Sequence, residues 1–104
     1  MGEYKVRISD LAKQDIQDTA SYIMSDLQEP SIVDKTIENM VDAIFTLEDM
    51  PTRIGLVRDD RLAGKQIRGL RINNYTAFYR VHDETKTVEV IRVLYSRRDW
   101  AVLL

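Results

Sequence analysis

A chain of 104 residues with 44% hydrophobic and 31% charged residues predicts one soluble domain spanning residues 1–104. The absence of cysteine excludes a disulfide framework and thiol chemistry, and a lone histidine, His82, argues against a transition-metal site. No apolar run reaches the roughly 18 residues of a membrane span, and the N-terminal residues form no apolar signal segment. We therefore expect a cytoplasmic protein that uses neither a metal nor another cofactor.

Charge is divided unevenly between the two halves of the chain. Residues 1–50 carry 4 Lys/Arg against 11 Asp/Glu, whereas residues 51–104 carry 11 Lys/Arg against 6 Asp/Glu. The second half also holds nine of the ten arginines, whose planar guanidinium suits phosphate or carboxylate groups. This asymmetry predicts a cationic surface for a nucleic acid or an acidic peptide. The same charges are equally compatible with arginines that pair with the acidic half.

The first half of the chain has the pattern of one strand and two helices. Residues 4–8 alternate apolar and charged side chains, as a half-buried strand does. Ser9 or the aspartate after it can cap a helix over 10–28, whose apolar residues recur three and four positions apart. A second amphipathic helix over 30–48 starts at a proline and stops before Pro51. The short link between them predicts an antiparallel helical hairpin.

The second half changes to a strand period. Residues 51–65 contain a proline and two glycines and predict a surface loop with a short helical turn. Three strands follow at 66–72, 75–82 and 87–95, separated by short turns, and the third is apolar on both faces, which is typical of a central strand. Residues 99–104 are compatible with a short helix or an extended tail.

These elements predict an α+β fold. The order is strand, two helices, then a three-stranded antiparallel meander, giving a four-stranded, mostly antiparallel sheet with both helices on one face. The other face would stay partly open, and a one-residue slip in any strand would exchange its faces.

Few chemistries fit the residues that remain. The chain has no Gly-rich phosphate loop and no nucleophile beside His82, and Asp59-Asp60 lies between arginines as a solvated salt-bridged turn would. Cations with a tyrosine can bind RNA phosphates and stabilise a pentavalent phosphorane without a metal. Tyrosine can also act as acid or base or stack on a base, as Trp100 can. Candidate catalytic residues are Arg92, Tyr95 and Arg71, and candidate nucleic-acid contacts are Lys65, Arg68, Arg80, Arg97 and Arg98.

The placement of these side chains is open at this stage. Arg68 and Arg71, three apart, leave a flat strand on opposite faces unless Gly69 makes a bulge. Core packing is the expected role of Tyr75 and of the aromatic pair at 78–79, and a solvated role for the arginines is equally compatible with the pattern.

Several segments, in order, resemble those of RelE/ParE-type toxins, the plasmid stabilisation toxin family. Residues 74–81 (NYTAFYRV) resemble that family's nY-x-i-x-Y-x-V strand, and residues 64–71 resemble the G-x-R-x-L-x-V strand before it. Residues 88–100 (VEVIRVLYSRRDW) resemble the last strand and tail, and the Val6–Ile16 and Leu47–Pro51 segments fit as well. The resemblance covers nearly the whole chain.

The resemblance implies the toxin of a type II toxin–antitoxin pair, encoded beside an antitoxin that wraps it in a hetero-oligomer. RelE-like members cut mRNA in the ribosome, and ParE-like members poison DNA gyrase. Of these we expect a metal-independent, ribosome-dependent mRNA interferase that inhibits translation. The alternatives are a gyrase poison and a non-toxic antitoxin-binding module. An acidic or amphipathic antitoxin segment would then meet Arg68, Arg71, Arg80 or Arg92.

Compared residue by residue with the family's functional positions, the chain matches some of them and departs from others. Tyr95 and Arg92 match a late tyrosine and arginine of one ribosome-dependent branch, while Leu94 stands where that branch has a catalytic histidine. Thr76 stands where RelE-like members commonly have arginine, and residues 94–100 also resemble the L-H-x-x-R-D ending of ParE-like members. The matches to basic residues of the family's second strand and tail are Lys65, Arg68 and Arg97.

Overall fold

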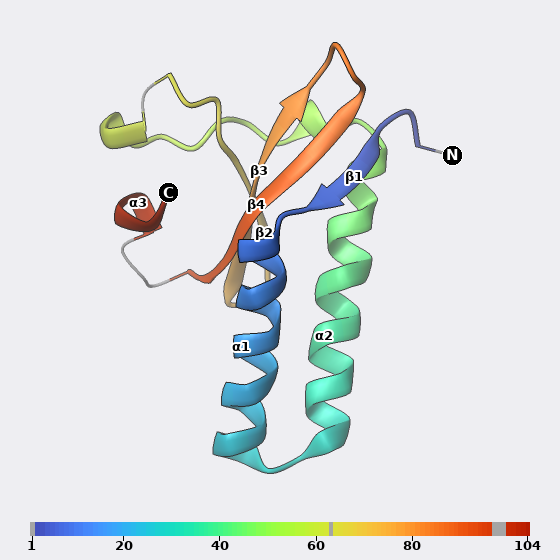
Figure 1. Cartoon of the computed structure of the whole chain (residues 1–104), viewed down its shortest axis with the longest axis vertical. Helices are drawn as coiled ribbons and strands as arrows, with labels where there is room; N and C mark the ends of the chain where they lie inside the picture. The colour runs from blue at the N-terminus through green and yellow to red at the C-terminus, as the bar shows by residue number, and fades with distance from the viewer. Residues whose placement is uncertain (1, 63, 97–99) are drawn as a thin grey trace.

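The computed structural model describes residues 2–62, 64–96 and 100–104 (Figure 1). The order of its elements is the predicted one, and the surface loop carries short 3-10 turns at Pro51–Arg53 and Asp60–Leu62. A further 3-10 turn, Thr46–Glu48, ends the second helix three residues earlier than expected. The helices and strands are β1 (Lys5–Ile8), α1 (Asp10–Leu27), α2 (Pro30–Phe45), β2 (Arg68–Ile72), β3 (Tyr75–His82), β4 (Thr87–Tyr95) and α3 (Trp100–Leu103).

The four strands form one mixed sheet in the order β1-β4-β3-β2. β2, β3 and β4 form the antiparallel meander, and β1 joins β4 in parallel, with Ile8 opposite Val90. β4 therefore lies in the interior of the sheet, as its two apolar faces predict. The expected fold class is confirmed.

Ser9 connects the first helix to the sheet. Its hydroxyl oxygen accepts a hydrogen bond from the backbone N–H of Ala12 at 3.0 Å, which caps α1 as the sequence predicts. The same hydroxyl donates to the carbonyl oxygen of Ile91 at 2.9 Å, on β4. The start of α1 is therefore held against β4 immediately beyond the end of β1.

Apolar residues pack on both faces of the sheet. The larger cluster lies on the helix side and includes Met40 and Ile44 of α2 together with Ala77, Tyr79 and Val90 of the sheet. A smaller cluster on the opposite face is built by Phe78 and Leu94, which pack with residues of the surface loop and of the C-terminus (Leu62, Ile67, Leu103 and Leu104). The face expected to be partly open is thus partly covered by loop and C-terminal side chains.

A β-bulge in β4 decides which side chains share a face. Phe78 lies opposite Arg92 but Tyr79 lies opposite Val90, which leaves Ile91 as an extra residue. The bulge reverses the alternation, so Val93 rather than Arg92 joins Val90 in the helix-side cluster.

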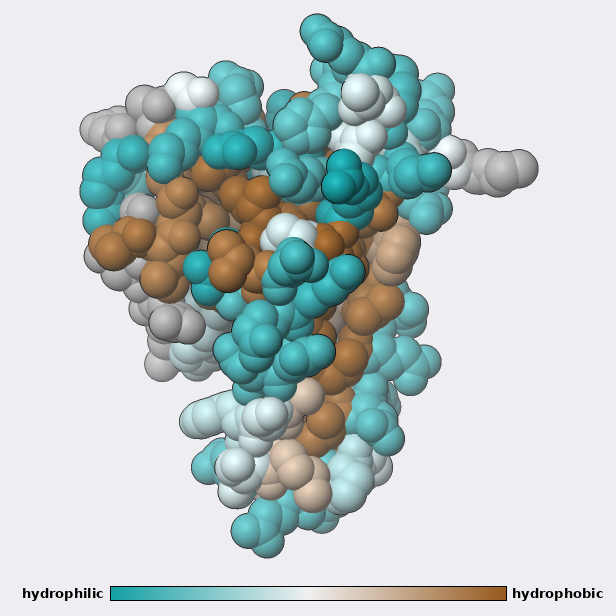
Figure 2. Space-filling model, in the orientation of Figure 1, coloured by the Kyte–Doolittle hydropathy of each residue, from teal (hydrophilic) through white to brown (hydrophobic). Residues whose placement is uncertain are grey.

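The helical hairpin extends well past the sheet (Figure 1). The buried residues of α1 and α2 lie in the parts nearest the sheet, and from Ala20 to Glu38 every described side chain is exposed or half-buried. Figure 2 shows an apolar band that continues along the hairpin between hydrophilic side chains. Among the described residues, no helix combines the length and the hydropathy that a membrane crossing requires.

Candidate functional site

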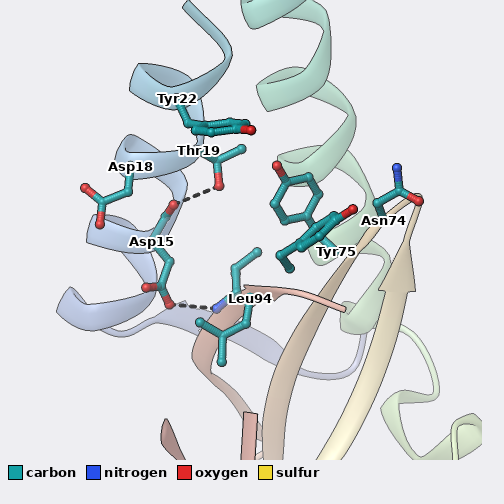
Figure 3. Close-up of a pocket in the computed structure, with 9 residues that line it drawn as sticks. Asp15, Asp18, Thr19, Tyr22, Asn74, Tyr75 and Leu94 are labelled. Atoms are coloured by element: carbon teal, nitrogen blue, oxygen red, sulfur yellow. Dashed lines mark hydrogen bonds between the residues drawn. The ribbon is translucent and has the colours of Figure 1, made fainter. Parts of the chain in front are cut away.

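A groove of about 620 Å³ lies between α1 and the neighbouring ends of β3 and β4 (Figure 3). We call it the tyrosine groove because three of its residues are tyrosines, one on each of the three elements. Its lining consists of Asp15, Asp18, Thr19 and Tyr22 from α1, Asn74 and Tyr75 at the start of β3, and Val93, Leu94 and Tyr95 at the end of β4. Segments more than fifty residues apart therefore build one site.

Asp15 forms the base of the groove on the helix side. Its carboxylate accepts hydrogen bonds from Nε and Nη2 of Arg92 at 2.8 and 2.9 Å, and from the backbone N–H of Val93 at 2.9 Å. The Asp15 and Arg92 side chains are 9% and 18% exposed, so the ion pair is largely shielded from water. The hydrogen bond from Arg92 to Asp15 raises the pKa of the guanidinium, despite the opposing effect of burial. Arg92 is thus a charged, tethered residue.

The three tyrosines differ in exposure. Tyr75 and Tyr95 are direct partners across β3 and β4, and their rings meet edge to face with centroids 5.5 Å apart. Burial raises the pKa of Tyr75, and its contact with the Thr19 hydroxyl acts in the opposite direction. Tyr22 is 66% exposed and extends from α1 toward the side of the groove where Tyr75 lies (Figure 3). The groove therefore offers aromatic surface at several depths.

The outer edge of β4 forms one wall of the groove. β1 pairs with this edge only as far as Val90, and beyond that point side chains of the α1 region replace a strand. Ser9 binds the Ile91 carbonyl and Asp15 binds the Val93 N–H. Because alternate residues direct their backbone groups to the same side, the Val93 carbonyl and the Tyr95 N–H also face this edge.

The structure does not bring the three candidate catalytic residues together. Tyr95 leaves β4 on the helix face, opposite Tyr75, whereas Arg71 lies opposite Thr76 on the other face. The Nε of Arg71 donates to the carbonyl of Asn73 at 2.8 Å. Arg92 is bound to Asp15. The expected cluster of arginine and tyrosine around one reacting phosphate is therefore not present in this arrangement.

The candidate nucleic-acid contacts are also separated. The β2–β3 register has no shift, so Arg68 lies on the helix side, where its guanidinium binds the carbonyl of Ile54, and Arg71 lies on the opposite face. Arg80 donates to the backbone carbonyl of Lys65 at 3.0 Å, which brings this pair together. Lys65 in turn donates to the carbonyl of Leu104 at 3.2 Å. The predicted contacts at 97 and 98 lie outside the described residues.

The sequence patterns missed most of the groove. Asp15, Thr19 and Tyr22 follow one another at helical spacing, beside the apolar stripe of α1. That spacing was a usable signal for a polar and aromatic edge on the helix. Their partners on β3 and β4 could not be identified without the register of the sheet. No set of three or more His, Cys, Asp or Glu residues within the described part of the chain is placed to hold a metal ion.

A family model matches nearly the whole chain, over residues 6–100. Its description is "ParE toxin of type II toxin-antitoxin system, parDE". Comparison with curated protein sequences gave no match.

Solved structures with a similar fold come from bacteria and an archaeon. A chain of the chromosomal ParDE system of P. aeruginosa is 16% identical, with a TM-score of 0.73, and the match covers 89% of this chain and 96% of that one. A chain of the RelBE2 toxin–antitoxin complex of Mycobacterium tuberculosis is 26% identical, with a TM-score of 0.62 and coverage of 88% and 96%. A chain of the RelE–RelB complex of Pyrococcus horikoshii OT3 is 14% identical, with a TM-score of 0.59 and coverage of 92% and 98%.

Proposed function

This chain belongs to the family of ParE toxins of type II toxin–antitoxin systems, and from that premise we propose that it arrests growth by poisoning DNA gyrase. The single observation that carries the choice is the ion pair between Arg92 and Asp15. An arginine that stabilises a reacting phosphate must direct its donors at that phosphate. Here two donors of Arg92 are directed at a carboxylate of the protein itself. This arrangement favours a toxin that acts by binding over one that cleaves RNA.

Two neighbouring positions support the same proposal. Leu94, which stands where an RNA-cleaving branch has a histidine, is 2% exposed and packs in the smaller apolar cluster with Phe78. Thr76, which stands where RelE-like members commonly have arginine, shares a 3.0 Å hydrogen bond with the hydroxyl of Ser96. Neither position supplies a proton donor or a cation suited to cleavage of a phosphodiester bond.

We propose that a cognate antitoxin neutralises this chain in a hetero-oligomer. The solved neighbour from M. tuberculosis, which is 26% identical, is a chain of a toxin–antitoxin complex, and this supports the second part of the proposal. Both the toxin and its target would then act in the cytoplasm.

Pulse labelling after tight induction of the chain alone tests the target. Thymidine and methionine incorporation are followed in parallel, with an uninduced culture as the control. We expect thymidine incorporation to fall first, together with double-strand breaks in the DNA. Purified chain should likewise trap gyrase on cleaved plasmid. Early loss of methionine incorporation, with mRNA cut at in-frame codons, would contradict the gyrase target.

The second candidate is the ribosome-dependent mRNA interferase expected from the sequence. It is favoured by the 26% identity to a chain of the RelBE2 complex and by the 38% exposure of Tyr95 at the groove. Cleavage would require Arg92 to leave Asp15 or another cation to replace it. The same labelling experiment separates the two candidates, and a chain that inhibits neither process would instead be an antitoxin-binding module.

A further inference from the structure

We propose that the tyrosine groove is the docking site of one segment of the antitoxin, extended in conformation, with an apolar side chain and a neighbouring basic one. The inference rests on the proposed toxin–antitoxin pairing. It differs from the expectation that an acidic or amphipathic segment meets the arginines, because it assigns contact to a surface whose described charged residues are acidic.

The exposed wall of β4 argues for an extended segment. The Val93 carbonyl and the Tyr95 N–H face the groove at an edge where β1 has already ended. A chain laid along that edge would satisfy both groups and continue the sheet from the end of β1, as in strand-addition complexes. Asp15 already holds the Val93 N–H, so the segment would begin its pairing beyond that point.

The aromatic rings argue for an apolar side chain in the segment. Tyr75 and Tyr95 form an edge-to-face pair whose outer partner is 38% exposed, and Tyr22 stands 66% exposed on the opposite wall. Large amphipathic rings around a concave surface are typical anchors of protein interfaces. The groove volume of about 620 Å³ is comparable to that of pockets that enclose a compact ligand, so it can receive more than one side chain.

The charges argue for a basic neighbour. Among the described residues, the carboxylates that line the groove are those of Asp15 and Asp18, and no Lys or Arg belongs to the lining. Arg92 balances the charge of Asp15, but the described residues give Asp18 only the neutral amide of Gln14, at 2.9 Å. Asp18 lies on the side of α1 that is turned away from the strands, at the rim of the groove (Figure 3). A Lys or Arg of the segment would complement that rim charge.

The experiment measures binding of this chain to the protein encoded by the adjacent antitoxin gene. Tyr95→Ala and Tyr22→Ala each remove an anchor, and we expect dissociation to accelerate by about tenfold or more. Asp18→Lys reverses the rim charge, and we expect association to slow severalfold at low salt, with the difference shrinking as salt rises. The matched controls lie on α2, and neither residue lines the groove. They are Phe45→Ala, at an aromatic residue that is 41% exposed, and Asp42→Lys, at an exposed aspartate. Both control variants should bind the antitoxin as the wild type does.

Hydrogen exchange supplies a readout that requires no substitution. Antitoxin binding should slow exchange of the Tyr95 amide, while the Arg71 amide on the distant edge strand β2 should keep its rate. Equal binding by groove and control variants, or an unprotected Tyr95 amide in the complex, would overturn the docking site while leaving the gyrase proposal standing. Groove variants that bind antitoxin normally but lose growth arrest would assign the groove to the toxin's target, which also overturns the inference. A wild-type chain that binds no product of the adjacent gene would remove the pairing itself.

Discussion

The carboxylate of Asp15 and the guanidinium of Arg92, 77 positions apart in the sequence, form a bidentate ion pair with two hydrogen bonds, which joins α1 to β4. The same carboxylate also holds the Val93 N–H. One aspartate therefore fixes both the position of the helix and the end of the β4 edge. Removing either partner leaves a largely buried charge unpaired, which costs more than losing an exposed ion pair.

Asp15→Asn and Arg92→Gln are each expected to lower the free energy of unfolding by about 2–4 kcal/mol, because each leaves the other group uncompensated. The double variant should be less destabilised than the sum, with a coupling of about 1–3 kcal/mol. Urea denaturation measures all three. Glu89→Gln, which breaks the exposed pair with His82, is the control, and a change under about 1 kcal/mol is expected there. Additive single effects would show that the ion pair is not a coupled unit.

Tyr95→Phe and Arg71→Ala should leave growth arrest unchanged. The two side chains lie on opposite faces of the sheet, so they cannot act together on one phosphate. An RNA-cleaving enzyme that used either as a catalytic group would lose about 10²-fold or more of its activity. Growth after induction is scored, with circular dichroism to check the fold. Ribosome-dependent mRNA cleavage by the wild-type chain that is lost in either folded variant would contradict the binding mechanism.

Leu94→His should not create an RNA-cleaving enzyme. The Leu94 side chain is packed with Phe78 and the C-terminal leucines, so an imidazole would be buried without a partner. We expect a loss of about 2–4 kcal/mol in the free energy of unfolding. Leu94→Met keeps the volume and should cost under about 1.5 kcal/mol. Ribosome-dependent mRNA cleavage by the histidine variant would refute this placement.

Tyr79 makes the stability depend on alkaline pH. The ring is fully buried, its hydroxyl donates to the Pro51 carbonyl at 2.7 Å, and burial raises its pKa above the usual value near 10. The folded state then holds this proton more tightly than the unfolded state does. The contribution of the Tyr79 proton to the free energy of unfolding is therefore complete below pH 10. It is lost as the pH rises through the pKa of Tyr79 in the folded protein.

Tyr79→Phe tests this linkage. The variant should be about 1 kcal/mol less stable at pH 7, because the hydrogen bond is lost. Its stability should then fall less steeply above pH 10 than that of the wild type. Burial also raises the pKa of Tyr75, so some alkaline loss should persist in the variant. Urea unfolding midpoints of the wild type and the variant, from pH 7 to above pH 10, measure the loss at pH 7 and the slope above pH 10. An equal fall of the two midpoints above pH 10 would contradict the linkage.

Local patterns predicted the elements well because each depends on neighbours in the sequence. The cap at Ser9, the apolar stripes of the two helices and the alternation in β3 all have short-range causes. Arg68 and Arg71 are three positions apart, so the alternation of a regular strand places them on opposite faces of the sheet. This expectation holds because β2 has no bulge. The fold was therefore accessible from periodicity and turn residues.

The candidate site was harder to predict from the sequence because it depends on the pairing register of β3 and β4. The extra residue Ile91 reverses the faces of β4, and no local signal in a run of β-branched residues marks it. In the sequence Asp15 has no identifiable partner, because Arg92 and Val93 lie 77 and 78 positions away. Arg68, Arg71 and Arg80 were correctly located in strands, but their hydrogen bonds to backbone carbonyls could not be foreseen.

The parallel pairing of β1 with β4 has a consequence for synthesis. Contacts such as that between Ser9 and Ile91 span 82 positions, which gives the fold a high contact order and slows its final assembly. During translation β1 and the helical hairpin emerge first, and β1 can join the sheet only after β4 has emerged. The tyrosine groove, which is lined by α1 and by the neighbouring ends of β3 and β4, therefore forms only after β4 has been synthesised and has left the ribosome. A nascent chain that lacks β4 has no such groove, so the antitoxin segment proposed to dock there would find its binding surface only after β4 is in place.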